Sequence, residues 1–286
     1  MPKTIGLLKQ WGYTEARVIG KGAFSEVYCV KDAATGRSFA CKVSEEQNML
    51  KRESFFLQKL SHPLFPAFHA YRQWGEQSFL VMEYVEGINL KELIAREGSL
   101  PETRVVEIAV ELAEGLNYLH EQTPPILFRD LKPDNIMLDA DGRVKLLDLG
   151  SACFSGTAKQ AITGTPGFAA PEQWEEKAVE GFYSDVYGLA RVMCYMLIAP
   201  REAYTEWELQ GSRLMKAKVH RGVALLLEEC LRKDYRERIP DMRFFLQKLV
   251  PYYSGSRGGI LKAEIVSYFR KKNTAEYIFQ KNILNG

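Results

Sequence analysis

Hydrophobic and polar residues alternate along the first third of the chain. Over residues 13–43 the alternation has a period of two and is interrupted by glycines, which is typical of short antiparallel strands joined by turns. We expect three strands there and two more at residues 67–72 and 78–83. Between these groups, residues 47–60 carry apolar side chains at helical spacing, and His62-Pro63 ends that expected helix.

The remainder of the chain has mainly helical periodicity. A helix is expected to begin near Pro101, because proline is favoured in a first turn. Its apolar face comprises Val105, Ile108, Ala109, Leu112, Leu116 and Leu119. A short hairpin is expected around Asp141-Gly142, and further helices at residues 183–198, 223–231 and 241–249. The pattern therefore predicts a strand-rich first part and a helix-rich second part.

Composition narrows the class of protein. A chain of 286 residues with 46% hydrophobic residues can bury the core of one two-lobed domain or of two domains. A net charge of +2, with both signs mixed along the chain, predicts no nucleic-acid partner. Five scattered cysteines without a Cys-x-x-Cys pair indicate neither disulfides nor a zinc site, which favours a reducing, cytoplasmic location.

No signal peptide or transmembrane segment is predicted. Residues 1–11 contain only a small apolar cluster around Leu7-Leu8, far short of a signal-peptide core. The longest apolar helical stretch, residues 186–199, is interrupted by Arg191 and is shorter than the roughly 20 apolar residues of a membrane span. We expect a buried core helix there.

Three early features fit phosphate binding, and each also has an ordinary structural explanation. Glycines in the run Gly20-Lys21-Gly22-Ala23-Phe24-Ser25-Glu26-Val27 would let backbone amides approach phosphate oxygens, although a tight turn is the commoner reason for such spacing. Lys42 lies in an otherwise apolar strand, and Glu53 on the next expected helix can face it. Lone lysines and helix glutamates are, however, mostly solvated.

A stronger signal lies in the middle of the chain. The run Phe128-Arg129-Asp130-Leu131-Lys132-Pro133-Asp134-Asn135 is followed, after the expected hairpin, by Asp148-Leu149-Gly150. Phosphoryl transfer requires oxygen ligands for metal ions, such as Asn135 and Asp148, and a carboxylate such as Asp130 to accept the hydroxyl proton. A turn rich in Asp, Pro and Asn would explain either half alone, but not both in this order.

These motifs, in order from Gly20 to Arg238, resemble the signature of protein kinases, and the chain looks like the eukaryotic-like serine/threonine kinases of bacteria. The resemblance implies an α+β, bilobal fold with a small antiparallel-sheet N-lobe carrying one main helix and a larger, mostly helical C-lobe. The expected boundaries are an N-terminal extension at 1–12 and a kinase domain at 13–250. This domain divides into an N-lobe at 13–85 and a C-lobe at 86–250, and a basic, helical C-terminal extension follows at 251–286.

The same resemblance implies a site for ATP and magnesium, with manganese as an alternative metal. The loop from Gly20 to Ser25 would cover the phosphates, with Ser25 replacing the third glycine, and apolar side chains would enclose the adenine. The backbone of Glu83 and Val85 would bind the adenine edge. The implied nucleotide-binding residues are Gly20, Lys21, Gly22, Ala23, Phe24, Ser25, Val27, Ala40, Lys42, Met82, Glu83, Val85 and Met137.

Roles in catalysis are also implied by the resemblance. Lys42, paired with Glu53, would contact the α- and β-phosphates. Asp130 would be the catalytic base and Lys132 would steady the γ-phosphate. Asn135 and Asp148 would bind the metal.

The segment from Asp148 to Ala170-Pro171-Glu172 resembles an activation segment. By the resemblance Gly164-Thr165-Pro166-Gly167-Phe168 would dock a protein substrate, Glu172 would pair with Arg238, and Asp185 would hold the catalytic-loop backbone. Lys132 together with Thr165 points to serine or threonine acceptors.

Regulation is expected to involve Arg129, which resembles the arginine that receives an activation-segment phosphate. Thr157 and Thr163 are the expected autophosphorylation sites, whereas Thr165 is expected to be structural. Cys153 stands where relatives often supply a second basic residue. We therefore expect basal activity without phosphorylation and a limited gain with it.

Two substitutions depart from the family pattern: Phe128 replaces the usual histidine, and Leu149 the usual phenylalanine. A column of Phe128, Leu149, Leu57 and Phe68 is expected to join the lobes. A pseudokinase scaffold is one alternative, supported by Phe128 and opposed by the intact polar motifs. A small-molecule phosphotransferase is another, opposed by the Glu172 and Arg238 pattern.

Residues 251–286 lie beyond the resemblance and carry a net charge of +4. Packing of this extension against the second lobe is the favoured expectation, and contact with a partner or a membrane surface is the alternative. Proteins with serine or threonine acceptors are the expected partners.

Overall fold

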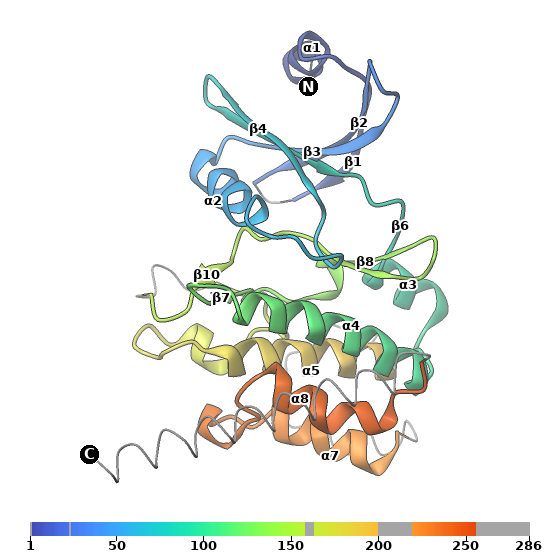
Figure 1. The fold of residues 1–286 in the computed structure, drawn as a ribbon, viewed down its shortest axis with the longest axis vertical. Coiled ribbons are helices and arrows are strands. Elements are labelled where there is room, and N and C mark those ends of the chain that lie inside the picture. Colours follow the sequence, from blue (N-terminus) through green and yellow to red (C-terminus); the bar gives the residue numbers. More distant parts are fainter. Residues whose placement is uncertain (1, 23, 158–162, 200–218, 256–286) are drawn as a thin grey trace, which may run out of the picture.

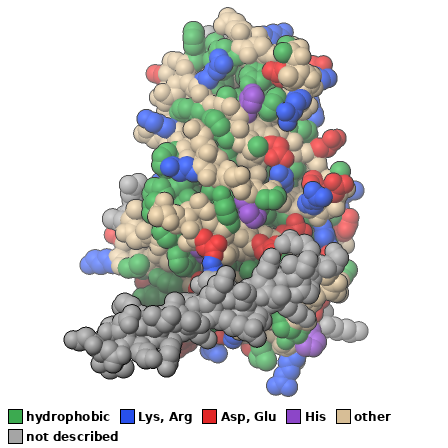
Figure 2. All heavy atoms as spheres, viewed as in Figure 1, with side chains coloured by type: hydrophobic (Ala, Val, Ile, Leu, Met, Phe, Trp, Pro, Cys, Tyr) green, Lys and Arg blue, Asp and Glu red, His purple; other side chains and the backbone are tan. Residues whose placement is uncertain are grey.

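The computed structural model describes residues 2–22, 24–157, 163–199 and 219–255 and shows two lobes, a sheet above and a bundle of helices below (Figure 1). Both the strand-rich first part and the helix-rich second part are confirmed. Basic and acidic side chains are interspersed on the face shown in Figure 2.

The upper lobe is a five-stranded antiparallel sheet with the order β1-β2-β3-β5-β4. Its strands are β1 (Tyr13–Lys21), β2 (Glu26–Asp32), β3 (Ser38–Ser44), β4 (Phe68–Trp74) and β5 (Gln77–Glu83), all close to the expected positions. Helix α2 (Gln47–Leu57) packs against β3, β4 and β5. Central strand β3 is buried from its second residue onward, because it pairs on both edges and is covered on both faces.

Helix α1 (Pro2–Gln10) covers the outer face of this sheet, and we did not expect it (Figure 1). Leu8 is completely buried in a cluster that includes Cys41 and Phe79. Trp11 meets the Phe79 ring edge to face at 4.8 Å, and the Arg72 guanidinium lies over Trp11. The apolar residues of α1 are too few for a strong helical pattern, and only tertiary contact with the sheet accounts for their burial.

The lower lobe is built from helices around α4 and α5. Its helices are α3 (Leu90–Glu97), α4 (Glu102–His120), α5 (Phe182–Ile198), α7 (Arg221–Cys230) and α8 (Met242–Leu249). All but α3 were expected. Helix α3 is only eight residues long, and local signals define its ends: Asn89 accepts a hydrogen bond from Glu92 N–H, and Gly98 follows with a positive φ of 81°.

Short strands and 3-10 turns lie where the lobes meet and along the loops. The strands are β6 (Gly87–Asn89), β7 (Ile126–Leu127), β8 (Ile136–Asp139), β9 (Val144–Leu146) and β10 (Cys153–Phe154), and the 3-10 turns are η1 (Pro133–Asn135), η2 (Pro171–Trp174), η4 (Tyr235–Glu237) and η5 (Val250–Tyr252). The expected hairpin is formed by β8 and β9, and β6 pairs with β8 on its other edge.

Helix α5 is the buried helix of the lower lobe, as expected. All of its residues from Ser184 to Cys194 are buried, and the one cation among them, Arg191, donates from Nε to the Gly167 carbonyl at 2.5 Å. Among the residues that the structure describes, no helix has the length and apolar character needed to cross a membrane.

Candidate active site

Lys42 and Glu53 form a buried ion pair between β3 and α2. The Lys42 Nζ lies 2.8 Å from Glu53 Oε2, and the two side chains are only 7% and 2% exposed. The same ammonium contacts Asp148 Oδ1 at 2.9 Å, so one cation joins the sheet, α2 and the segment after β9. Asp148 has a positive φ of 66°, a conformation that is rare for residues other than glycine and that is typically held by surrounding contacts.

Burial and the neighbouring charges shift the pKa values of Lys42, Glu53 and Asp148 in different directions. Burial alone would lower the pKa of Lys42, but the neighbouring Glu53 and Asp148 carboxylates outweigh burial and raise it, so the ammonium stays charged. Burial raises the pKa of Glu53 to about 7 against the opposing effect of Lys42. Burial would also raise the pKa of Asp148, but Lys42 outweighs it and the pKa is lowered. Asp148 is therefore the firmly anionic carboxylate of this group.

A second polar cluster contains Asp130, Lys132 and Thr165. Lys132 Nζ donates to Asp130 Oδ2 at 2.7 Å and to Thr165 Oγ1 at 3.0 Å. The Thr165 hydroxyl in turn donates to Asp130 Oδ1 at 2.6 Å. All three expected residues are thus brought together, and Thr165 links the activation segment to the catalytic loop.

Asp185, near the start of α5, holds the backbone that precedes Asp130. Its carboxylate accepts the N–H groups of Phe128 and Arg129 at 2.9 and 2.8 Å. His120, at the end of α4, contacts the same carboxylate through Nε2 at 2.9 Å, and its ring stacks on Phe182. The contact of Asp185 was expected, whereas that of His120 was not, because nothing in the local pattern pairs residues 65 positions apart.

The two expected metal ligands, Asn135 and Asp148, lie on backbone segments that are joined by a hydrogen bond, and both offer oxygen atoms that suit a metal. Asn135 Nδ2 donates to the Asp130 carbonyl at 3.0 Å, which leaves the amide oxygen as the atom that suits a cation. The Leu147 N–H, next to Asp148, donates to the Asn135 carbonyl at 2.7 Å. No group of three or more His, Cys, Asp or Glu side chains in the described part of the chain could cage a metal. Magnesium is usually bound by one or two carboxylates plus substrate phosphates, so this pair fits it.

The expected adenine-binding residues lie on adjoining strands. Ala40 on β3 faces Met82 on β5, Val27 on β2 faces Lys42, and Met137 lies on β8. The Glu83 N–H donates to the Ala67 carbonyl at 2.8 Å, which leaves the Glu83 carbonyl as the backbone group for the expected contact with the adenine edge. The expected role of Val85 at the adenine edge stays a prediction.

The glycine loop closes as a turn between β1 and β2. Gly22 N–H donates to the Ser25 carbonyl at 2.7 Å, and Gly20 pairs with Val27. The Lys21 ammonium contacts Glu26 at 2.9 Å in an exposed ion pair, and Phe24 is exposed. The Lys21 side chain is thus engaged at the surface, its expected role at the nucleotide stays a prediction, and Ala23 lies outside the described residues.

The expected brace between Glu172 and Arg238 is present and buried. Arg238 donates from both terminal nitrogens to the two Glu172 oxygens at 2.7 and 2.9 Å, with the side chains 0% and 3% exposed. Ser184 also donates to Glu172 at 2.8 Å, and the guanidinium lies over the Tyr187 ring. The brace joins the end of the activation segment to the lower lobe.

The residues that depart from the family pattern are accommodated by packing. Phe128, Leu149 and Leu57 are buried in one hydrophobic core, and Phe68 packs against it. The expected apolar column thus lies within a single core that spans both lobes.

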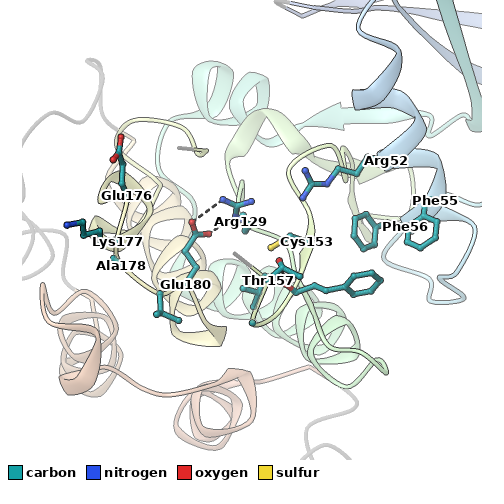
Figure 3. Close-up of a pocket in the computed structure, with 14 residues that line it drawn as sticks. Arg52, Phe55, Phe56, Arg129, Cys153, Thr157, Glu176, Lys177, Ala178 and Glu180 are labelled. Atoms are coloured by element: carbon teal, nitrogen blue, oxygen red, sulfur yellow. Dashed lines mark hydrogen bonds and ion pairs between the residues drawn. The ribbon is translucent and has the colours of Figure 1, made fainter. Parts of the chain in front are cut away.

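Arg129 already has an anionic partner, which we did not expect. Its Nε and Nη2 donate to the Glu180 carboxylate at 2.5 and 3.0 Å, and both side chains are nearly buried. Figure 3 shows this pair on the wall of a cavity of about 560 Å³, with Arg52 of α2 and Thr157 also on the wall.

The three threonines of the activation segment differ in access. The Thr163 hydroxyl oxygen is buried and has no hydrogen-bond partner among the described residues, and its phosphorylation stays a prediction. Thr157 is exposed and donates to the Phe154 carbonyl at 2.7 Å. Thr165 is engaged with Asp130, as expected for a structural residue.

Sequence comparison decides the family. The family model described as protein kinase domain matches residues 13–257. The chain belongs to the protein kinase family. This kinase has an antiparallel-sheet N-lobe and a helical C-lobe, in agreement with the bilobal kinase fold.

Relatives of this kinase are named as serine/threonine kinases. Serine/threonine-protein kinase RUNKEL of Arabidopsis thaliana is 33% identical over 235 residues, covering 77% of this chain and 17% of that protein. Serine/threonine-protein kinase Sgk3 of Mus musculus is 32% identical over 251 residues, covering 81% of this chain and 50% of that protein. CBL-interacting protein kinase 21 of Oryza sativa subsp. japonica is 30% identical over 209 residues, covering 68% of this chain and 39% of that protein. The chain spans half or less of the length of these relatives, and together they support a serine/threonine kinase.

Proposed function

We propose that this kinase transfers the γ-phosphate of ATP to serine and threonine hydroxyls of proteins, with magnesium, or alternatively manganese, as the metal. The observation that carries the proposal is the simultaneous contact of Lys42 with Glu53 and Asp148. In protein kinases the lysine–glutamate pair and the metal-binding aspartate must both be in place for transfer. In this chain Lys42 contacts both carboxylates, Glu53 and Asp148.

The described side chains divide the work of the reaction between them. Lys42 offers a buried ammonium, whose pKa is raised by the neighbouring carboxylates, for the α- and β-phosphates, and Glu53 holds it extended. Asn135 and Asp148 would hold the metal, which when bound neutralises charge on the phosphates. Asp130 accepts a hydrogen bond from the Thr165 hydroxyl, which supports a role of its carboxylate in orienting a substrate hydroxyl for attack. Lys132 adds a positive charge beside it.

The polar groups argue against the two alternatives. A scaffold without catalysis would not need the cluster of Asp130, Lys132 and Thr165, which is intact. A small-molecule phosphotransferase would not need the buried Glu172 and Arg238 brace, which holds the loop that would dock a polypeptide. The narrower resemblance to bacterial kinases stays a prediction, since the relatives named above come from plants and animals. The cytoplasmic location also stays a prediction.

Transfer to matched peptides tests the proposal directly. We expect γ-labelled ATP and magnesium to label peptides that carry a single serine or threonine, but not the same peptides carrying tyrosine or alanine. EDTA should abolish labelling, and excess magnesium should restore it. Nucleotide binding without transfer to any peptide or protein mixture would instead support the scaffold.

Regulation of the site follows from the partner of Arg129. We infer that the Glu180 carboxylate occupies the place at Arg129 that an activation-segment phosphate would take, so the unphosphorylated kinase already has an anion at this arginine. A phosphate on Thr157 would enter a cavity that already holds this carboxylate, where Arg52 and Lys177 are the other cations among the lining residues that the structure describes. The gain from phosphorylation should therefore be small.

Glu180→Gln is expected to lower both the stability and the basal turnover of the unphosphorylated kinase. The amide removes one charge-assisted hydrogen bond to a buried guanidinium, which costs about 1.5–3 kcal/mol of unfolding free energy. Urea unfolding and peptide phosphorylation after phosphatase treatment measure the two effects.

Glu176→Gln is the matched control, because Glu176 is an exposed residue that lines the same cavity. It should behave as wild type. A phosphatase-treated wild type that is silent until Thr157 is phosphorylated would refute the role of Glu180.

Of the C-terminal extension expected at residues 251–286, residues 256–286 lie outside the described residues. Its packing on the lower lobe, or its contact with a partner or membrane surface, stays a prediction.

A further inference from the structure

Gln173 lies beneath the activation segment and contacts three backbone groups. It is 2% exposed on η2. Its Nε2 donates to the Arg129 carbonyl at 2.7 Å and to the Thr163 carbonyl at 3.2 Å, and its Oε1 accepts the Ala170 N–H at 2.9 Å. One amide therefore ties the catalytic loop to both ends of the loop from residue 163 to residue 170.

The two carbonyls lie next to the residues that meet at the candidate base. Arg129 directly precedes Asp130, and Thr163 stands two residues before Thr165, whose hydroxyl donates to Asp130 at 2.6 Å. The catalytic loop and the activation segment thus reach the same carboxylate from two sides. Gln173 thus binds the backbone of each segment one or two residues before the side chain that makes this contact.

Close packing around Gly164 shows that this arrangement leaves little free space. A Cβ built on Gly164 would lie 2.5 Å from the Ala169 Cβ and 3.2 Å from Gln173 Nε2. Gly164 also has a φ of 127°, which disfavours other residues. The backbone at residue 164 therefore runs directly against the amide.

We propose that Gln173 is a positioning residue, which sets Asp130 relative to Thr165 by holding the Arg129 and Thr163 carbonyls together. The proposal rests on the proposed kinase function. A primary amide suits the task because it donates twice and accepts once. A carboxylate of the same shape cannot donate and would face two carbonyl oxygens.

Substitution of Gln173 should lower turnover without affecting nucleotide affinity. We expect Gln173→Glu and the apolar, equally long Gln173→Met to reduce kcat by about 10- to 100-fold, since misplacement of a reacting group by about 1 Å costs up to that much. The nucleotide Kd should be unchanged, because the Lys42, Glu53 and Asp148 group does not include Gln173. Both variants are assayed well below their melting temperatures, and the methionine variant serves if the glutamate variant does not fold.

Gln122→Glu is the control for the chemical change. Gln122 also donates from Nε2 to a backbone carbonyl, that of Tyr118, at 2.8 Å. It is half-buried and lies just beyond α4. This variant should retain wild-type kcat.

A double-mutant cycle with Thr165→Val separates positioning from a general loss of stability. If Gln173 acts through the contact between Thr165 and Asp130, the double variant should lose about as much kcat as Thr165→Val alone. Losses that multiply, or Gln173 variants with wild-type kcat, would overturn the positioning role while the kinase function stands. A wild type that transfers no phosphate would overturn the proposed function, and the positioning role with it.

Discussion

Asp130→Asn should abolish most phosphate transfer while leaving nucleotide binding intact. The amide keeps the shape of the carboxylate and can still accept one hydrogen bond from Thr165, but it cannot accept a proton and loses its ion pair with Lys132. Loss of a general base typically costs about 10²- to 10⁴-fold in kcat. Asp130 does not contact Lys42 or Asp148 in the ion pairs described above, so the Kd for Mg·ATP should not change.

Asp134→Asn, four residues along the same loop, is the matched control. Asp134 pairs with Lys91 at 2.7 Å, but both side chains are well exposed. Exposed ion pairs contribute little to stability, and we expect kcat within about a factor of two of wild type. Peptide phosphorylation and titration with a fluorescent nucleotide analogue give both quantities. Equal rates for wild type and Asp130→Asn would show that Asp130 is not the base.

Arg238→Met should produce the largest loss of stability. It removes a bidentate partner and leaves the Glu172 carboxylate buried, with Ser184 as a remaining donor. Breaking a buried pair from one side costs about 3–5 kcal/mol. With about 2–4 °C per kcal/mol for a domain of this size, the melting temperature should fall by about 6–20 °C.

Two further variants make the result specific. Arg236→Met removes an exposed arginine two residues away, whose contact with Asp234 is 3.5 Å long, and should leave the melting temperature nearly unchanged. Glu172→Gln in the Arg238→Met background should recover part of the loss, because a neutral amide is less costly to bury than a carboxylate. Similar melting temperatures for Arg238→Met and Arg236→Met would show that the brace contributes no stability.

The periodic pattern of hydrophobic residues predicted most strands and helices. The resemblance to a known family predicted some of the contacts between residues far apart in the sequence. The alternation over residues 13–43 predicted three strands, and three are present, although β3 buries both of its faces because the sheet is covered on both sides. The contacts of Lys42 with Glu53 and of Glu172 with Arg238 were implied by the resemblance to the kinase family, and the structure contains both.

The remaining features depend on tertiary contacts that no local pattern contains. Glu180 and Gln173 lie in a loop and a 3-10 turn, where no periodicity marks a buried face. Arg129 and Glu180 are 51 residues apart, and their meeting depends on how the whole intervening segment folds. His120 could have been noticed as a polar residue at the end of an apolar helix face, but its partner Asp185 lies on another helix.

Helix α1 turns the upper lobe into a three-layer sandwich, with helix, sheet and helix stacked in that order (Figure 1). Successive residues of β3 serve opposite layers: Cys41 packs toward Leu8 of α1, whereas Lys42 reaches Glu53 of α2. A recombinant fragment that begins at residue 13, where the family match begins, would retain every polar group around Lys42. It would expose to water the apolar face of the sheet, including Phe79, that Leu8 covers. Self-association of such a fragment through this uncovered apolar face would mask its catalytic properties.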